Sequence, residues 1–94
     1  MDLHQYAPYQ IINVSESFAT TVTSMSSHEL KDQNYIILGT DQGTVIRYVQ
    51  AAQKFNFKGK MTVFGKGDPV KGVFATSYGV LSVSSKEILF LENN

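Results

Sequence analysis

The side chains in this sequence that could do chemistry are its histidines, its serines and its scattered carboxylates. His4 and His28 are the only histidines, and neither has a second histidine or a carboxylate at the spacing that a metal site requires. The serines lie in strand-like alternation or at the ends of expected strands, and no Gly-x-Ser-x-Gly turn presents one as a nucleophile. We therefore expect no catalytic residue, no metal ligand and no bound cofactor, and we place His28 in a solvated polar loop.

A glycine-rich segment, Gly65-Lys66-Gly67-Asp68, has some of the residues of a phosphate-binding loop. Such a loop needs four residues between its glycines, and a helix must follow so that backbone N–H groups surround the phosphates. Here Pro69 and an expected strand follow, so we interpret the segment as a connection between strands. An enzymatic role, which would depend on Asp41, Asp68 or His28, ranks third among the functional alternatives.

Lysines and phenylalanines are interleaved in the segment 54–71. The lysines are Lys54, Lys58, Lys60, Lys66 and Lys71, and the phenylalanines are Phe55, Phe57 and Phe64. Such a segment can bind single-stranded nucleic acid, because lysines contact phosphates while aromatic rings stack on bases. Alternatively, the phenylalanines pack between sheets and the lysines protect an exposed strand edge. We prefer the second interpretation because the chain has zero formal net charge, and a nucleic-acid-binding β domain is the alternative.

Two tyrosines near the start of the chain, Tyr6 and Tyr9, flank a proline. Tyrosine suits protein interfaces because it buries a large ring and keeps a polar tip. We therefore expect Tyr6 and Tyr9 to contact a protein partner, together with Lys54, Lys58 and Lys66.

The composition is that of a folded, neutral chain. Its 94 residues are 43% hydrophobic and 17% charged, which fits a single folded domain, or a segment of one, at 1–94 and argues against intrinsic disorder. Zero net charge gives no long-range attraction to nucleic acid or to an anionic membrane. The sequence contains no cysteine and shows neither a signal peptide nor a stretch long enough for a membrane helix. We expect a cytoplasmic protein that does not insert into membranes.

Strand-forming residues recur in short bursts, without helical periodicity. Between two of these bursts, Asp41 favours a turn and Gly43 can adopt a positive φ, so a hairpin is predicted with Thr40, Asp41 and Gly43 as its structural turn. Tyr78-Gly79 predicts another short turn, whereas 28–34 and 50–59 resemble longer polar connections. Short links are typical of an antiparallel meander. The expected strands span approximately 10–14, 20–26, 34–39, 44–49, 60–64, 70–76, 79–84 and 87–91.

The second half of the chain repeats the first in weaker form. The segment 38–48 has a counterpart at 83–91, about 43 to 45 residues later, and this is the period of a four-stranded propeller blade. Earlier in each half, 21–25 aligns with 69–73. The repeat predicts two four-stranded units, at approximately 10–49 and 60–91.

These features resemble WD40-type β-propeller repeats. The segment 39–45, Gly-Thr-Asp-Gln-Gly-Thr-Val, is similar to the family's turn between its second and third strands. The segment 67–73, Gly-Asp-Pro-Val-Lys-Gly-Val, is similar to its approach to the first strand, although Asp68 stands where histidine is usual and the chain has no tryptophan. The resemblance implies that Thr40 and Asp41 are the remaining members of the family's buried hydrogen-bond network. It also implies that 10–14 is an outer strand able to pair with another blade.

The predicted fold is therefore all-β, with antiparallel four-stranded meander blades that form a partial β-propeller. A small closed β-sandwich or barrel is the alternative. Propellers use four blades or more, and two sheets alone leave edges and apolar faces uncovered. We expect a non-catalytic scaffold for protein–protein interaction, completed by self-assembly into a homo-oligomer or by further blades of another chain.

Overall fold

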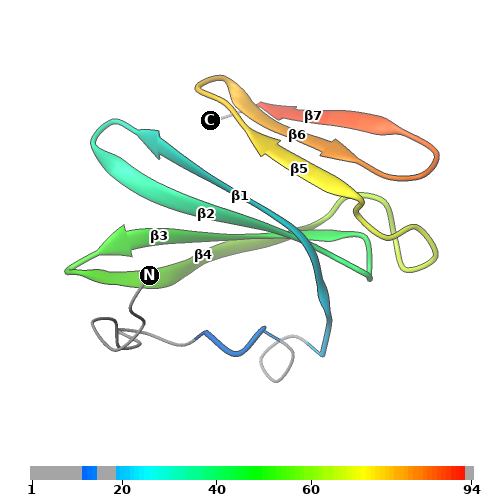
Figure 1. Ribbon diagram of the computed structural model, residues 1–94, viewed down its shortest axis with the longest axis horizontal. Helices are drawn as coiled ribbons and strands as arrows, with labels where there is room; N and C mark the ends of the chain where they lie inside the picture. Colours follow the sequence, from blue (N-terminus) through cyan, green and yellow to red (C-terminus); the bar gives the residue numbers. More distant parts are fainter. Residues whose placement is uncertain (1–11, 15–18, 93–94) are drawn as a thin grey trace, which may run out of the picture.

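The computed structural model describes residues 12–14 and 19–92, and its strands form two antiparallel sheets (Figure 1). The first sheet contains β1 (Val22–Leu30), β2 (Gln33–Thr40), β3 (Thr44–Ala51) and β4 (Lys54–Thr62), and the second contains β5 (Gly72–Ala75), β6 (Gly79–Val83) and β7 (Ile88–Glu92). Both sheets are meanders whose strands follow chain order. The predicted all-β antiparallel fold is confirmed. Neither sheet closes on itself within the described residues, so the closed-barrel alternative is wrong.

Two connections that were expected to be long and polar are tight turns of two residues. β1 continues through His28, and β4 begins at Lys54, so 28–34 and 50–59 are mostly strand. Two successive residues with positive φ give the turn geometry whose twist matches antiparallel strands. Glycine and asparagine are the usual residues of such a turn, and neither occurs in these two turns, so no local pattern predicted them. The turn residues are Lys31, Asp32, Ala52 and Gln53, with φ angles of 52°, 64°, 52° and 65°.

β4 begins at Lys54, earlier than expected, so the first sheet extends further along the chain than the predicted first unit. β4 pairs with β3 along its length, so the first sheet spans 22–62 and the second spans 72–92. These spans do not coincide with the units expected at 10–49 and 60–91, because the strand expected at 60–64 is the end of a longer strand of the first sheet. Residues 12–14 of the strand expected at 10–14 belong to neither sheet, and residues 10 and 11 lie outside the described residues.

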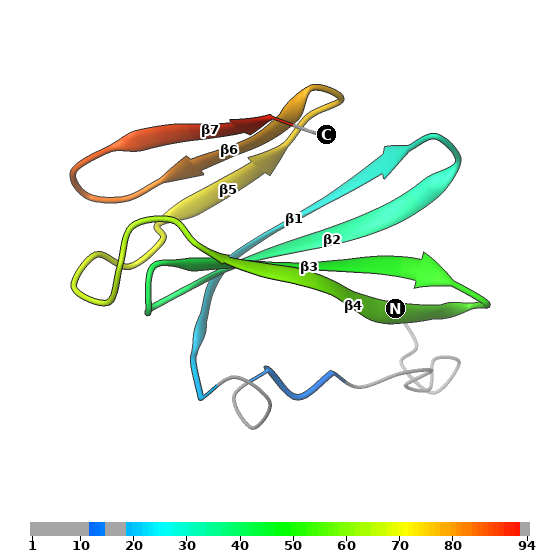
Figure 2. The same ribbon diagram turned by 180° about the vertical axis from the view of Figure 1, so that it is seen from behind.

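β1 and β5 lie side by side, while β4 and β7 lie on opposite outer sides of the molecule in both views (Figures 1 and 2). Three hydrogen bonds join the sheets near these inner strands. The Ala75 N–H donates to the Ser26 hydroxyl at 3.0 Å, and the Val70 N–H donates to the Thr40 carbonyl at 2.9 Å. The Thr23 hydroxyl donates to the Val70 carbonyl at 2.5 Å. Both backbone polar groups of Val70 therefore fix the approach to β5 onto the first sheet.

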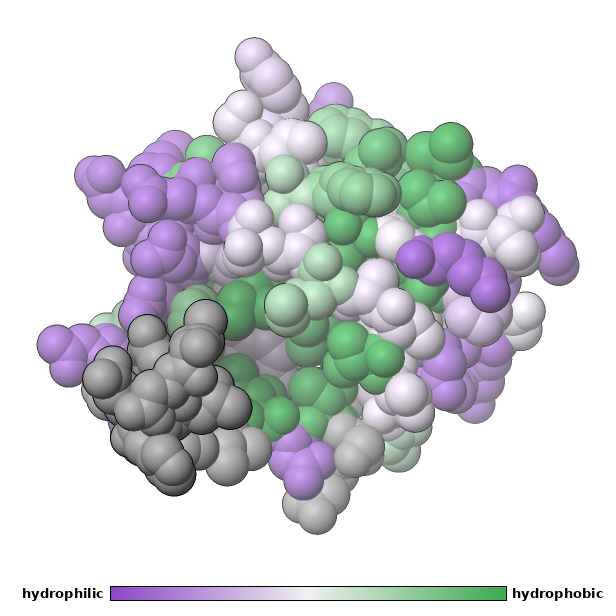
Figure 3. Space-filling model, in the orientation of Figure 1, coloured by the Kyte–Doolittle hydropathy of each residue, from purple (hydrophilic) through white to green (hydrophobic). Residues whose placement is uncertain are grey.

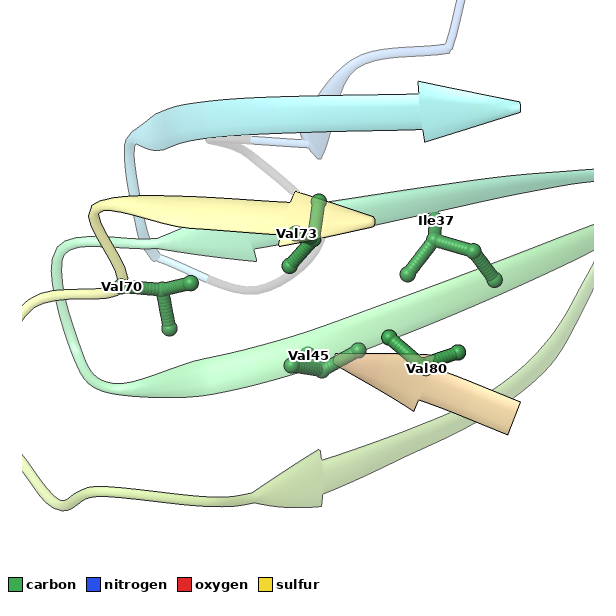
Figure 4. Close-up of a cluster of buried hydrophobic side chains, with 5 residues drawn as sticks. All are labelled: Ile37, Val45, Val70, Val73 and Val80. Carbon is green, nitrogen blue, oxygen red and sulfur yellow. The ribbon is translucent and has the colours of Figure 1, made fainter. Parts of the chain in front are cut away.

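An apolar cluster fills the space between the two sheets (Figure 4). Ile37 from β2 and Val45 from β3 meet Val73 from β5 and Val80 from β6, with Val70 among them. The most exposed of the five, Val80, has only 6% of its surface exposed. Because burying one such side chain contributes about 1.5–3 kcal/mol, this cluster makes the two sheets one packed body.

The opposite face of the first sheet is covered by residues that precede β1. Leu38, Ile46 and Tyr48 form a second buried cluster with Val14, and Ile12 packs against it. The central strands of the first sheet are thus buried on both faces.

Candidate functional site

The turn between β2 and β3 is built around the buried hydroxyl of Thr40. Its oxygen accepts hydrogen bonds from the N–H groups of Gln42, at 3.2 Å, and Thr44, at 3.3 Å. It also lies 2.6 Å from the Thr44 hydroxyl, with which it shares a hydrogen bond. Gly43 adopts a φ of 72°, a conformation that glycine reaches without steric cost. All of these groups act within the turn, so Thr40 and Gly43 have structural roles here.

Asp41 joins this turn to the segment that leads into β1. Its Oδ1 accepts hydrogen bonds from the Thr20 hydroxyl, at 2.9 Å, and from the Thr21 N–H, at 3.1 Å. The Asp41 N–H in turn donates to the Thr21 carbonyl at 3.0 Å. The pKa of the Asp41 carboxyl is lowered, first by the Thr21 N–H and next by the Thr20 hydroxyl, because both hydrogen bonds favour the carboxylate.

The second sheet repeats this arrangement with other residues. The Ser84 hydroxyl oxygen, at the turn between β6 and β7, accepts hydrogen bonds from the N–H groups of Lys86, at 3.1 Å, and Glu87, at 3.0 Å. The neighbouring Ser85 hydroxyl donates to Asp68 Oδ1, in the segment before β5, at 3.4 Å. In the first sheet the turn carries the carboxylate, Asp41, and the hydroxyl of Thr20 precedes β1. In the second sheet the turn carries the hydroxyl of Ser85, and the carboxylate of Asp68 precedes β5. The sequence repeat is therefore also a repeat of hydrogen-bonded structure.

The lysines expected to contact a partner are exposed but do not form one patch. Lys54 opens β4, Lys58 lies within it, and Lys66 follows it in the connection to β5. Since β4 has nine residues and a strand rises about 3.3 Å per residue, these lysines are distributed along roughly 30 Å. Lys58 lies beside an aromatic ring, with its Nζ 6.0 Å from the centre of the Tyr35 ring.

The two tyrosines expected at the interface, Tyr6 and Tyr9, lie outside the described residues.

A small basic hollow lies between the sheets, and the sequence did not reveal it. It has a volume of about 100 Å³, and its lining includes His28, Tyr35, Arg47, Lys58 and Val80. The expectation that His28 lies in a polar loop is wrong, because His28 is half-buried in β1 opposite Tyr35 and its Nε2 has no hydrogen-bond partner. Three basic side chains around one hollow suit an acidic group of a partner. Arg47 alternates with Val45 and Val49 in the sequence, and this spacing could have predicted that the three side chains lie on the same face of β3.

The second sheet has an apolar face that points away from the first sheet, and we call it the open face. Side chains alternate between the two faces of a strand, so the neighbours of the buried Val73 and Val80 lie on the open face. Hydrophobic side chains gather over part of this sheet at the molecular surface (Figure 3). Phe74 is 56%, Ile88 71% and Phe90 45% exposed. Such exposure of several large apolar side chains on one face of a sheet is typical of an interaction surface.

Within the described residues, 12–14 and 19–92, no three His, Cys, Asp or Glu side chains are grouped closely enough to hold a metal ion. The same residues include no helix that is long and apolar enough to cross a membrane. Comparison of the chain with known protein families gives no match, and neither does comparison with curated proteins.

Proposed function

We propose that this chain is a non-catalytic β scaffold for protein–protein interaction and that its sheets are two blades of a propeller-like assembly. The observation that carries the proposal is the open face, because it exposes Phe74 on β5 and both Ile88 and Phe90 on β7, the two strands that flank β6. A face of this kind is stabilised when another sheet packs on it. The assembly is completed by other copies of the chain or by the blades of another chain.

The arrangement of the two sheets supports a blade-like role. The inner strands β1 and β5 lie side by side and the last strands of each sheet lie on opposite outer sides (Figures 1 and 2). A hydroxyl at the end of the second strand of each sheet accepts hydrogen bonds from the following turn: Thr40 is the last residue of β2, and Ser84 directly follows β6. Repeated units that pack on their neighbours are the basis of propellers and other repeat folds.

The contacts to a protein partner are assigned to Lys54, Lys58 and Lys66, with Tyr6 and Tyr9. The lysines lie on the rigid edge strand β4 and in the loop that follows it, which are the kinds of element that present contact residues to a partner. Lys58 also lines the basic hollow beside Arg47. An acidic loop of a partner protein would find complementary charge along this side of the molecule.

The test is affinity purification of the full tagged chain from its native cells, followed by quantitative mass spectrometry. A contact variant carries Lys54→Glu, Lys58→Glu, Lys66→Glu, Tyr6→Ala and Tyr9→Ala. Its control carries Lys31→Glu, Lys71→Glu and Lys86→Glu, which change the net charge by the same amount at other exposed lysines. We expect a specific protein to be lost with the contact variant and kept with the control. Equal recovery by both variants would contradict the assignment.

A second candidate function, nucleic-acid binding by the segment 54–71, is favoured by one observation. Phe57 is 52% exposed on β4, with the exposed Lys54 before it and the exposed Lys58 and Lys60 after it. Phe55, by contrast, packs against the buried cluster of the first sheet. Binding of a labelled single-stranded oligonucleotide at two salt concentrations tests this candidate. Affinity that falls steeply with salt supports it, and a flat response counts against it.

A further inference from the structure

The open face of the second sheet contains two continuous apolar rows, and the pair of Gly79 and Glu92 lies beside them at one end of the sheet. Phe74, Leu81 and Phe90 lie opposite one another across β5, β6 and β7. Val83 and Ile88 form a second row beside them, opposite Gly72. No position in either row carries a charged or polar side chain.

The internal repeat shows what kind of surface this is. When the turn hydroxyls Thr40 and Ser84 are superimposed, Ile37 of the first sheet corresponds to Leu81 of the second. The turn after Ser84 is one residue shorter than the turn after Thr40. By strand pairing, Val45, which pairs with Gly39, therefore corresponds to Ile88, which pairs with Val83. Ile37 and Val45 are 2% and 3% exposed because the second sheet packs on them, whereas Ile88 is 71% exposed. The open face is thus the counterpart of a face that is already buried against a sheet within this molecule.

In the part of the chain that the structure describes, the other faces of the molecule offer no comparable row of apolar side chains. The two sheets pack on each other, and Ile12 and Val14 pack on the remaining face of the first sheet. The large hydrophobic side chains that stay exposed elsewhere are scattered: Val22 and Met25 on β1, Phe57 and Met61 on β4, and Tyr78 in the turn after β5. Since β1 and β4 are the two outer strands of the first sheet, these side chains do not form one continuous surface. Among the described residues, the best match for the open face of one copy is therefore the open face of another.

The charge of the chain permits such a pair, and the apolar rows supply part of the area that the pair needs. The chain has zero formal net charge, so two copies approach without long-range repulsion. One aromatic side chain can bury roughly 150–250 Å², and the two half-exposed phenylalanines with Ile88 therefore offer on the order of 300 Å² per copy. A standard interface buries about 800 Å² per partner. The rows would form the apolar core of a small interface, with polar residues at its rim.

Building on the scaffold role proposed above, we propose that the open face pairs with the same face of a second copy, giving a homodimer with two-fold symmetry. In a two-fold pair each residue meets the same patch on its partner, so the contact closes after two copies. In the alternative arrangement, the open face of one copy packs on an exposed side chain of the first sheet of the next copy, such as Met25. Such a head-to-tail contact would give open-ended chains of copies.

Light scattering coupled to size-exclusion chromatography tests the pair on the full chain. We expect the wild type to approach twice the mass of one chain at concentrations of tens of micromolar. Ile88→Lys places a charge in the apolar row and should reduce association at least tenfold. Met25→Lys, at a similarly exposed position on the first sheet, should leave association unchanged. A wild type that stays monomeric, or a mass that falls equally in both variants, would overturn the proposal.

The absence of cysteine from the sequence permits a second test that does not depend on a charged substitution. Leu81→Cys places a single thiol at the centre of the open face, and Met25→Cys places one at a more exposed position elsewhere. Under mild oxidation we expect a covalent dimer from Leu81→Cys in much higher yield than from Met25→Cys. The reverse order of yields would rule out face-to-face pairing.

These outcomes are separable from those of the proposed scaffold function. If the chain is monomeric but loses a protein partner when Lys54, Lys58 and Lys66 are replaced, self-pairing fails and the scaffold role stands. If the chain dimerises through the open face but the contact variant loses nothing, the self-pairing stands and the assignment of contact residues fails.

Discussion

The residues that define this molecule most clearly are two buried hydroxyls, Thr40 and Ser84. Each closes the second strand of its sheet and accepts hydrogen bonds from two N–H groups of the next turn. Without these oxygens the N–H groups would lose their acceptors. Thr44 is buried, whereas Lys86 and Glu87 are exposed, so the loss costs more in the Thr40 turn than in the Ser84 turn. Because an intramolecular hydrogen bond contributes about 0.5–1.5 kcal/mol, a single oxygen atom has a measurable role in each turn.

A pair of serine substitutions tests this role. Ser84→Ala should lower the free energy of unfolding by about 0.5–1.5 kcal/mol, because two backbone donors of a part-buried turn lose their acceptor. Ser82→Ala removes a buried hydroxyl that has no hydrogen-bond partner, so it should leave stability unchanged or raise it by up to about 1 kcal/mol. Urea unfolding of both variants measures the difference. Equal losses in the two variants would show that the hydroxyl of Ser84 has no special role.

Asp41 makes a separate prediction about acid stability. Its pKa is lowered in the folded state by the Thr21 N–H and the Thr20 hydroxyl. The carboxylate therefore stabilises the fold fully above about pH 5, and this contribution is lost as the pH falls through the usual aspartate range near 4 toward the lowered value. Asp41→Asn cannot titrate, so its unfolding free energy should fall less than that of the wild type between pH 5 and pH 2. Parallel pH curves for the two proteins would contradict this account.

At the scale of elements, the turn between β2 and β3 also anchors the connection that leads from the first sheet to the second. The Gly43 carbonyl accepts hydrogen bonds from the N–H groups of Val63, at 2.8 Å, and Phe64, at 2.9 Å. A Cβ atom at Gly43 would overlap the backbone of Gly65. The absence of a side chain at Gly43 thus allows the hairpin and the connection to touch.

Gly43→Ala should therefore destabilise the protein by more than about 2 kcal/mol, through the steric overlap and the positive φ together. Gly67→Ala, in the same connection, is its control. A Cβ atom there meets nothing within 4 Å, so the expected change is within about 0.5 kcal/mol. Thermal unfolding followed by circular dichroism separates the two variants. A Gly43→Ala protein as stable as Gly67→Ala would show that the connection can shift away from the hairpin.

The elements also show where sequence reasoning succeeds. The turn at 40–44 could be predicted because its signals, an aspartate and a glycine, are local. The turns at Lys31 and Ala52 could not, since lysine and alanine adopt positive φ only when the strands on either side hold them there. The partnership of Ser85 with Asp68 is likewise invisible in the sequence, because it depends on how the segment before β5 lies against the last turn.

At the scale of the whole molecule, the two sheets share a strand order and a turn arrangement but differ in how many of their faces are covered. The first sheet is covered on both faces of its central strands, and the second is covered on one. Alternating residues predicted the all-β fold, and the size of the chain predicted that apolar surface would stay uncovered. Which surface this is required the structure, because burial of Ile37 and exposure of Ile88 depend on which sheet packs on which face.

The central claim is that the open face of the second sheet is a packing surface that a neighbouring sheet of another copy completes. Sedimentation equilibrium of the unmodified chain over a wide concentration range tests it most directly. We predict an average mass that rises with concentration and levels off at twice the mass of one chain. A single-chain mass at every concentration, together with cooperative unfolding of that monomer, would contradict the claim.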